Sequence, residues 1–265
     1  MKIDLIEMNG LKIEYCQSGD SSRQSIVFAH GLGSSLHQWK KQIEYFSQSF
    51  RVIAFSLQGH GASSQPVQPE VYSIESYGKT VQILLENLKV ESCIWVGNSM
   101  GGVLGYYLRR MKPDLIRKLI TNGTTPKLIM PPLLVNIVVL MDKLMIRLLK
   151  FKGYIRFAAN HTSRIDRVKE DIFSIMSQSC PQAVIASHKI LGNYDFLDSI
   201  PENPFPIHII EGEYDKDINI YLDKYREIMK QSRIVTFHKI ANAGHMANMD
   251  QPEKYNRILE EILKK

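Results

Sequence analysis

One serine of the chain stands in a pattern that favours nucleophilic chemistry. Ser99 lies at the centre of Gly97-Asn98-Ser99-Met100-Gly101, between the pattern of a buried strand and that of a helix. A serine on so sharp a strand-to-helix turn adopts strained geometry, and flanking glycines let neighbouring backbones pass close by. The positive end of the following helix also points at whatever reacts there. We therefore predict that Ser99 is a nucleophile; the alternative is a helix N-cap serine among loop glycines.

A neutral serine hydroxyl is a poor nucleophile and needs a general base. Of the eight histidines, His245 lies in a short loop, Ala243-Gly244-His245-Met246, between the last predicted strand and the last helix. The carboxyl ends of parallel strands converge on one edge of a sheet, and sites form at that edge. We predict that His245 is the base; a histidine of a surface loop is the alternative.

An acid should orient this imidazole and stabilise its protonated form. Four acids follow the strand that ends near residue 210: Glu211, Glu213, Asp215 and Asp217. Glu211 still belongs to the strand direction, and Asp217 suits the cap of the next helix. The loop position of Asp215 makes it the preferred candidate.

Acyl transfer creates an oxyanion that requires two positioned hydrogen-bond donors. The glycine-rich segment at 30–34 (HGLGS) follows the third predicted strand and can bring a backbone N–H toward the serine. We predict the N–H groups of Leu32 and Met100 as the two donors; a plain strand-to-helix connection is the alternative. The segment is not a phosphate loop, because no G-x-x-x-x-G-K-[ST] pattern follows. A second glycine turn contains His60, which we interpret as structural, holding loops beneath the site.

Hydrophobic periodicity predicts the elements that position these residues. Two β-rich runs at 3–7 and 11–16 are joined by Asn9-Gly10, which suits a two-residue hairpin turn. Buried strands are predicted at 25–29, 51–55, 93–96, 115–121, 206–210 and 234–237, and helices at 40–47, 74–88, 101–111, 221–229 and 252–263. This alternation predicts an α/β fold with a mainly parallel sheet covered by helices on both faces.

The alternation lapses between 127 and 191, where the pattern is helical and contains no convincing strand. We therefore predict a core formed by 1–124 and 192–265, with a helical cap, or lid, at 125–191. The apolar stretch Leu128 to Met141 suits either the lining of an acyl pocket or the core of the cap, and the core is favoured.

Composition and charge exclude several classes of protein. The 265 residues are 44% hydrophobic and carry a net charge of +6, which fits a globular protein and not a disordered one. Ten basic and four acidic residues lie between Thr125 and Ile190, so this quarter accounts for the whole imbalance. Because the core is neutral, we predict no nucleic-acid partner. The basic cap indicates either solvated helix faces or a rim that attracts anionic substrates or an acidic carrier protein.

Other features concern the compartment. The three cysteines suggest neither a disulfide framework nor a zinc site, so we expect a reducing compartment and a cytoplasmic protein. We identify no signal peptide. The longest apolar stretch, 128–141, is interrupted by prolines and is shorter than the roughly 20 residues of a membrane helix, so we expect no transmembrane segment.

Taken together, these motifs resemble those of the α/β-hydrolase superfamily, and the resemblance covers essentially the whole chain. It rests on H-G-x-G-x-S at 30–35 followed by Trp39, G-H-G at 59–61, the serine turn, G-x-x-D at 212–215, and Gly-His at 244–245. The resemblance implies an eight-stranded, mostly parallel sheet with helices on both faces and a helical cap inserted after strand six. The resemblance implies a hydrolase that needs no cofactor and no metal.

The same resemblance implies Ser99, Asp215 and His245 as a catalytic triad. Some relatives place the acid after the sixth strand, but here that strand ends at Asn122, which cannot carry a negative charge. Many relatives also have D-x-R-G-H-G where this chain has S-L-Q-G-H-G at 56–61, which weakens assignment to a narrow subfamily. The serine nucleophile excludes the dehalogenase and epoxide hydrolase branches, which use aspartate.

We therefore predict a serine hydrolase acting on carboxylic esters, a carboxylesterase, with a small and partly apolar acyl substrate. The segment Asn98 to Gly102 is also similar to the corresponding turn of carbon–carbon bond hydrolases that split ring-cleavage products. Such a hydrolase, a lactonase and a thioesterase are the enzymatic alternatives. A ligand receptor that uses the same pocket is the non-enzymatic one.

Overall fold

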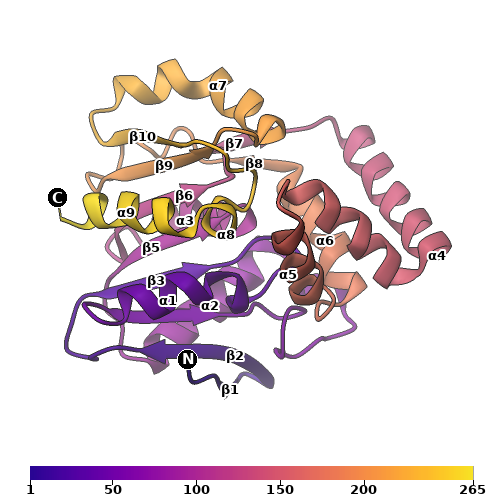
Figure 1. Ribbon diagram of the computed structural model, residues 1–265, viewed down its shortest axis with the longest axis horizontal. Coiled ribbons are helices and arrows are strands. Elements are labelled where there is room, and N and C mark those ends of the chain that lie inside the picture. The colour runs from indigo at the N-terminus through magenta and orange to yellow at the C-terminus, as the bar shows by residue number, and fades with distance from the viewer. Residues whose placement is uncertain (265) are drawn as a thin grey trace.

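The computed structural model describes residues 1–264, and an eight-stranded sheet runs through its centre (Figure 1). The strand order is β1-β2-β4-β3-β5-β6-β9-β10. The strands are β1 (Asp4–Met8), β2 (Leu11–Ser18), β3 (Ser25–Ala29), β4 (Arg51–Phe55), β5 (Cys93–Asn98), β6 (Ile116–Asn122), β9 (Ile207–Gly212) and β10 (Val235–Ile240). The β1–β2 and β2–β4 pairs are antiparallel and the others are parallel, which confirms the predicted sheet.

The local sequence explains where these strands begin and turn. Asn9 and Gly10 have φ of 50° and 76°, the conformation that a two-residue hairpin turn between β1 and β2 requires. Every residue of β3 and β4 is buried, so these strands are continuous apolar runs rather than alternating ones. This burial on both faces places β3 and β4 in the interior of the sheet.

Helices cover both faces of the sheet, as predicted. They are α1 (Lys40–Phe46), α2 (Ile74–Asn87), α3 (Met100–Met111), α7 (Lys216–Gln231), α8 (Ala247–Asp250) and α9 (Pro252–Leu263), with short 3₁₀ helices η1 (Leu36–Trp39) and η2 (Pro69–Val71). One buried apolar cluster joins the sheet to α2, α3 and α7 through residues such as Leu84 and Leu104. A second joins it to α1 and α9 through Phe46 and Tyr255. The sheet is therefore sandwiched between two helical layers.

The segment between β6 and β9 forms a layer of its own. It contains β7 (Lys127–Ile129), α4 (Pro132–Thr162), α5 (Asp166–Met176), α6 (Pro181–Leu191) and β8 (Asn193–Asp195), and its helices lie together at one end of the sheet (Figure 1). We call α4 to α6 the insertion helices. They share an apolar cluster that includes Ile155 and Ile172 and reaches Met246 in the histidine loop. The core-and-cap boundaries at 124/125 and 191/192 stay a prediction.

The expected span without convincing buried strands, 127–191, begins with the short strand β7, whose partner β8 lies just beyond that span. Strands β7 and β8 pair antiparallel and close the base of the insertion. Each has three residues, which is too short for a recognisable alternation of apolar and polar side chains. The pairing also depends on a partner more than sixty residues away in the sequence, which no local pattern reveals.

Helix α4 departs from expectation in two ways. Lys150 has φ 58° and ψ 163°, which interrupts the helix and bends it. The favoured interpretation of Leu128 to Met141 as cap core is wrong for most of this stretch, because Leu133 and Leu140 are 73% and 65% exposed whereas Val139 is buried. No helix within residues 1–264 is long and apolar enough to cross a membrane.

Candidate active site

Ser99 occupies the turn between β5 and α3 with φ 50° and ψ −117°. A β-carbon at Gly97 would lie 2.3 Å from the carbonyl oxygen of Gly101, and one at Gly101 would lie 2.2 Å from that of Ala29. Only glycine fits at these two positions, as the sequence predicted. Ser99 occupies the N-cap position of α3, but its side chain makes no capping hydrogen bond, which leaves the hydroxyl free of that structural role. The Ser99 N–H donates to the carbonyl of Asn122 at 2.9 Å, which fixes the turn to the end of β6.

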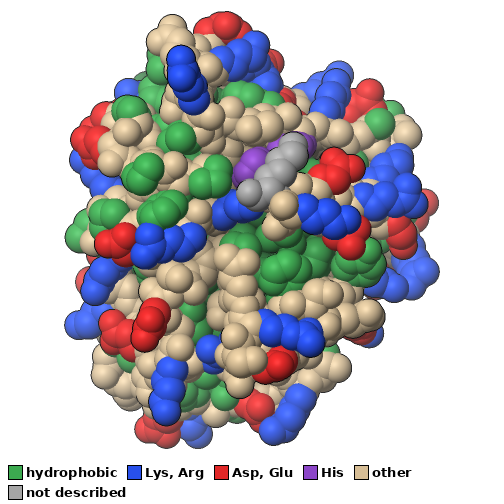
Figure 2. Space-filling model, turned by 90° about the vertical axis from the view of Figure 1, so that its left-hand side faces the viewer, with side chains coloured by type: hydrophobic (Ala, Val, Ile, Leu, Met, Phe, Trp, Pro, Cys, Tyr) green, Lys and Arg blue, Asp and Glu red, His purple; other side chains and the backbone are tan. Residues whose placement is uncertain are grey.

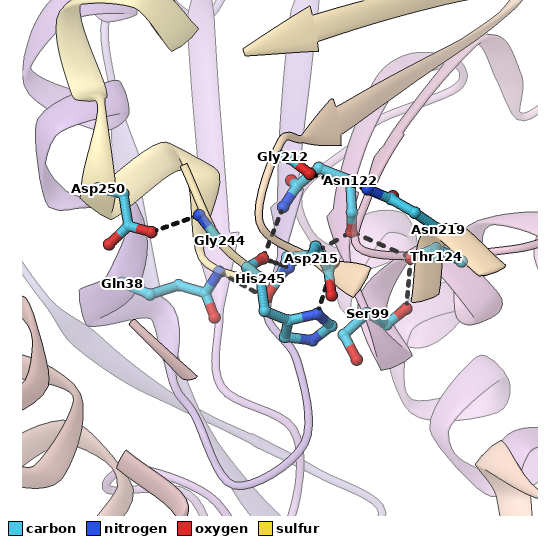
Figure 3. Close-up of polar contacts among 11 residues, drawn as sticks. Gln38, Ser99, Asn122, Thr124, Gly212, Asp215, Asn219, Gly244, His245 and Asp250 are labelled. Carbon is cyan, nitrogen blue, oxygen red and sulfur yellow. Dashed lines mark hydrogen bonds and ion pairs between the residues drawn. The ribbon is translucent and has the colours of Figure 1, made fainter. Parts of the chain in front are cut away.

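Asp215 and His245 meet at the same edge of the sheet. Asp215 follows β9 and precedes α7, and its buried Oδ2 lies 2.9 Å from Nδ1 of His245 (Figure 3). Figure 3 places Ser99 beside the His245 ring, although no hydrogen bond joins the two within the described part of the chain. Such contacts often tighten only when substrate binds. The structure therefore brings together the three residues that the sequence predicted as a triad.

The surroundings of His245 favour its protonated form. Burial alone would lower the pKa of this imidazole, but the charge of Asp215 and the hydrogen bond to it outweigh that effect. The pKa of His245 is consequently raised above 6.5. An imidazole of this kind accepts a proton from a serine hydroxyl more readily than an isolated one does.

The other acids after β9 have separate partners. Glu211 lies 2.9 Å from Nη1 of Arg226, and Glu213 accepts the N–H of Asn242 at 2.9 Å. Asp217 lies in the first turn of α7 rather than at its cap, which corrects the expected capping role. Of the four candidates, Asp215 is the one that contacts the histidine.

Two asparagines hold the histidine loop in place, a role for which no sequence pattern provides a signal. The side-chain amides of Asn98 and Asn122 donate to the backbone carbonyl of His245 at 3.1 and 3.4 Å. The hydroxyl of Tyr255 in turn donates to Oδ1 of Asn122 at 2.7 Å. Next to them, Gly123 has φ 59°, and a β-carbon there would lie 2.8 Å from the His245 ring. The ends of β5 and β6 thus hold the backbone of the histidine loop with neutral side chains.

Asp250 links the same loop to the insertion. One carboxylate oxygen accepts the N–H of Gly244 at 2.7 Å, and the other accepts the hydroxyl of Ser163 at 2.5 Å. Ser163 is the C-cap residue of α4, so this buried carboxylate connects the end of α4 to the residue before His245. Burial raises the pKa of Asp250, although its hydrogen bonds oppose the change.

The segment predicted to supply the oxyanion donors packs against the serine turn. A β-carbon at Gly31 would lie 3.2 Å from Cβ of Ser99. Leu32 and Ser99 line the same cavity, and Met100 is the first residue of α3, whose N–H has no acceptor within the helix. The arrangement is compatible with Leu32 and Met100 as the two donors, and that role stays a prediction.

A pair of buried histidines supports this segment from below. Nε2 of His30 accepts the N–H of Leu57 at 2.9 Å, and its Nδ1 contacts the carbonyl of Gly31 at 2.8 Å. The ring of His60 lies 4.9 Å from that of His30. Burial lowers the pKa of His30 to about 4 and that of His60 to about 3, so both rings are neutral at pH 7. The structure thus places His60 against His30 and outside the cavity at Ser99, as predicted for a structural residue.

A cavity of about 270 Å³ opens at Ser99 and His245 and extends under the insertion helices. The insertion and the adjoining loops line it mainly with apolar side chains: Leu32, Ala158, Ile172, Met176, Leu191, Ile218 and Met246. None of the described lining residues is Lys or Arg, and none belongs to the stretch 128–141. The described residues contain no cluster of His, Cys, Asp or Glu suited to a metal ion.

The cavity also has a polar centre that the sequence did not reveal. His188 from α6 and Tyr154 from α4 both line it. Behind them lies Asp142, whose Oδ2 is 2.7 Å from Nδ1 of His188 and whose Oδ1 accepts the Tyr154 hydroxyl at 3.1 Å. A second aspartate–histidine pair therefore faces the same cavity as the first, on the side of the insertion.

Comparisons with known proteins agree with this architecture. A family model of the alpha/beta hydrolase fold matches residues 24–149. The 3-oxoadipate enol-lactonase 2 of Acinetobacter baylyi is 23% identical over 99% of this chain and 97% of that protein. The structure of a thermophilic esterase from Thermogutta terrifontis with malate bound aligns with a TM-score of 0.85 and 23% identity, covering 100% of this chain and 98% of the other. The chain belongs to the α/β-hydrolase superfamily.

This α/β hydrolase also resembles a protein of another functional class. The karrikin insensitive 2 receptor CA of Petunia hybrida is 33% identical over 109 residues, which is 40% of each chain. The comparisons confirm the predicted superfamily and fold and support hydrolase activity.

Proposed function

We propose that this protein is a carboxylesterase that cleaves its substrate through an acyl-enzyme intermediate. The proposal rests on one observation: the Asp215–His245 pair lies beside Ser99 at the mouth of a mainly apolar cavity. That arrangement matches the nucleophile, base and orienting acid of serine hydrolases. A cavity of about 270 Å³ is small for a ligand site, so we expect short acyl groups.

The chemistry follows from the positions of these groups. As the Ser99 oxygen attacks the acyl carbonyl, its proton moves to Nε2 of His245, and Asp215 stabilises the imidazolium. The N–H groups of Leu32 and Met100 hold the oxyanion. The imidazolium then gives its proton to the departing alkoxide, leaving the acyl group on Ser99. A water molecule repeats the sequence, which releases the carboxylic acid and restores the serine.

A panel of substrates tests the class of bond. We expect turnover of p-nitrophenyl acetate and butyrate, with activity declining for long acyl chains, because the cavity is small for a ligand site. Comparison with thioesters and a ring-fission dienoate addresses the thioesterase and carbon–carbon hydrolase alternatives. Activity on the dienoate well above that on simple esters would contradict the proposal. Ligand-induced shifts in melting temperature without turnover would instead favour a receptor.

A lactonase is the second candidate, and the polar centre in the cavity favours it. His188, Tyr154 and Asp142 lie on the side of the insertion, so they suit a substrate with a second hydrogen-bonding group besides the reacting carbonyl. The Acinetobacter relative, which matches almost the whole chain, is named as an enol-lactonase of 3-oxoadipate, a dicarboxylic acid. When one carboxyl group of such an acid forms the lactone, the other carboxyl group stays free. We infer that a carboxylate-bearing lactone or ester would use this centre.

Replacing His188 with Gln tests the role of the polar centre. We expect kcat/KM for a carboxylate-bearing γ-lactone to fall at least tenfold, with little change for p-nitrophenyl butyrate, because only the first substrate reaches the imidazole. His161→Gln, an exposed histidine of α4, is the matched control. Equal losses on both substrates would contradict selective recognition.

The positive charge of the insertion provides a second test of whether the protein acts on a carboxylate-bearing lactone: the salt dependence of kcat/KM. Its Lys and Arg side chains do not line the described cavity, so any attraction of an anionic substrate acts at long range. Such attraction weakens as salt is added. We therefore expect kcat/KM for the carboxylate-bearing lactone to fall between low and physiological salt while that for the neutral ester stays constant.

A further inference from the structure

Helix α4 is apolar on the face that it turns away from the protein. Leu133, Ile137, Leu140, Leu144 and Leu148 follow one another at intervals of three or four residues, so they form one stripe. Each is exposed, with Leu133, Leu140 and Leu148 exposed by 65% or more. We call these five residues the outer stripe. The opposite side of the helix, with Val139 and Asp142, is buried. A continuous exposed apolar patch usually marks a contact with another protein or with a membrane.

Basic side chains accompany the outer stripe. Lys143 and Arg147 are exposed and follow Leu140 and Leu144 by three residues, so they lie along its margin. The one acidic residue of α4 is Asp142, which is buried against His188. The outer face of α4 therefore combines exposed apolar side chains with positive charge and holds no carboxylate of its own helix.

The far end of the molecule differs from α4 in its charge. Figure 2 shows the side remote from α4, where Lys and Arg side chains are intermingled with Asp and Glu. The excess of positive charge found in the sequence thus gathers on the same segment as the exposed apolar stripe. A binding partner for this segment must therefore accommodate both the positive charge and the exposed apolar stripe.

We propose that the outer stripe docks on the surface of a bilayer that contains anionic lipids. Amphipathic helices with Lys or Arg beside Leu-rich faces lie in the interface between lipid headgroups and acyl chains. There the apolar side chains contact the acyl chains and the basic side chains contact the anionic headgroups. A second copy of the chain fits this face poorly, because two basic margins would oppose each other without acidic partners. An anionic lipid surface supplies the complementary charge.

Docking through α4 has a consequence for the cavity. Tyr154, Ala158 and Thr162, which follow the bend of α4 at Lys150, line the cavity that opens at Ser99. The outer stripe and the cavity lining thus lie on two consecutive segments of α4, so a membrane-bound molecule would hold its cavity close to the lipid surface. Apolar esters partitioned into the bilayer would then be concentrated near the site. The membrane contact itself does not depend on the carboxylesterase proposal.

Co-sedimentation with vesicles tests the contact. We expect the full chain to bind phosphatidylcholine vesicles that contain 30% phosphatidylserine, with binding that weakens in salt, and to bind pure phosphatidylcholine less tightly. The double variant Leu140→Glu, Leu148→Glu should bind at least tenfold more weakly. The matched control is Val67→Glu, Ile220→Glu, which makes the same chemical change at two exposed apolar residues outside the stripe and should bind as the wild type does.

Other outcomes would overturn the proposal. Wild-type protein that fails to bind the anionic vesicles, or a stripe variant that binds as well as the control, contradicts membrane docking. A concentration-dependent dimer that the stripe variant disrupts, without vesicle binding by the wild type, identifies a second copy as the occupant instead. Hydrolysis of soluble p-nitrophenyl butyrate should be equal in all three proteins, which shows that the variants fold and separates this test from that of the esterase activity.

Discussion

Replacing Ser99 with Ala is expected to reduce ester hydrolysis by at least 10⁴-fold, the largest effect of any substitution in this protein. The hydroxyl is the atom that forms the acyl-enzyme, and removal of a triad serine costs about 10⁶-fold in kcat in a well-studied serine protease. The measurement is the initial rate of p-nitrophenyl butyrate hydrolysis. Labelling with a fluorophosphonate should be lost at the same time, because this reagent needs the serine oxygen.

The Ser99→Ala protein also tests whether the wild type is an enzyme or a receptor, because only an enzyme loses its turnover with this hydroxyl. The turn is held by backbone contacts, such as the N–H of Ser99 to the carbonyl of Asn122, so the variant should fold normally. A Ser47→Ala variant, which changes a half-buried serine directly after α1, controls for the substitution. Retention of more than a hundredth of the wild-type activity in purified Ser99→Ala protein would refute the assignment of the nucleophile.

Asp215→Asn should lower kcat by about 10³- to 10⁴-fold, the scale seen when the corresponding carboxylate is neutralised in serine proteases. The amide keeps the size of the side chain, but it removes the charge that stabilises the imidazolium and the acceptor that fixes the tautomer of His245. Glu213→Gln makes the same chemical change in the same loop. It should leave kcat within about threefold, because Glu213 bonds to Asn242 and not to the histidine.

The pH profile of Asp215→Asn gives a readout that a merely structural defect would not produce. In the wild type, kcat/KM should fall with decreasing pH through the raised pKa of His245, because the protonated ring cannot act as a base. Without Asp215, burial dominates and lowers that pKa. The acidic limb of the profile should therefore move to lower pH in the variant. An unchanged limb would contradict the pairing of Asp215 with His245.

Local patterns predicted the parts of the fold that local physics controls. Strands β3 and β4 match the predicted ranges, 25–29 and 51–55, because short apolar runs bounded by polar residues indicate buried strands. Helix α7 was predicted from 221 but begins at Lys216, because its N-cap residue Asp215 makes no side-chain capping hydrogen bond that would mark the start. The exposed face of α4 was missed for the opposite reason: an apolar helix pattern cannot show which side is covered.

In the candidate site, too, local patterns predicted some residues, whereas tertiary packing determines the roles of others. Ser99 and His245 stand in recognisable local motifs, and Asp215 follows from its position after a strand. Asn98 holds the histidine loop through the distant carbonyl of His245, and Asp250 joins that loop to the distant Ser163, so no spacing pattern identifies either residue. The pairing of Asp142 with His188 depends likewise on how α4 packs against α6.

The buried histidines beneath the catalytic loops also set how the protein tolerates acid. His30 and His60 are neutral in the folded state, with pKa values of about 4 and about 3, but in the unfolded chain each binds a proton below about pH 6.5. Because these folded-state pKa values are depressed, the stability that the pair contributes is complete above pH 6.5. It is lost as the pH falls toward 4 and 3.

Between pH 7.5 and 5.0 the free energy of unfolding should fall by about 2 kcal/mol for each of these histidines. Denaturant unfolding at the two pH values measures the loss, and His60→Asn should show a smaller loss than the exposed-site control His161→Asn. Equal losses in the two variants would contradict the link. The protein would then have two separate acid limits: a reversible one in catalysis, set by proton uptake at His245, and a structural one in which the loop that carries Leu32 loses its support.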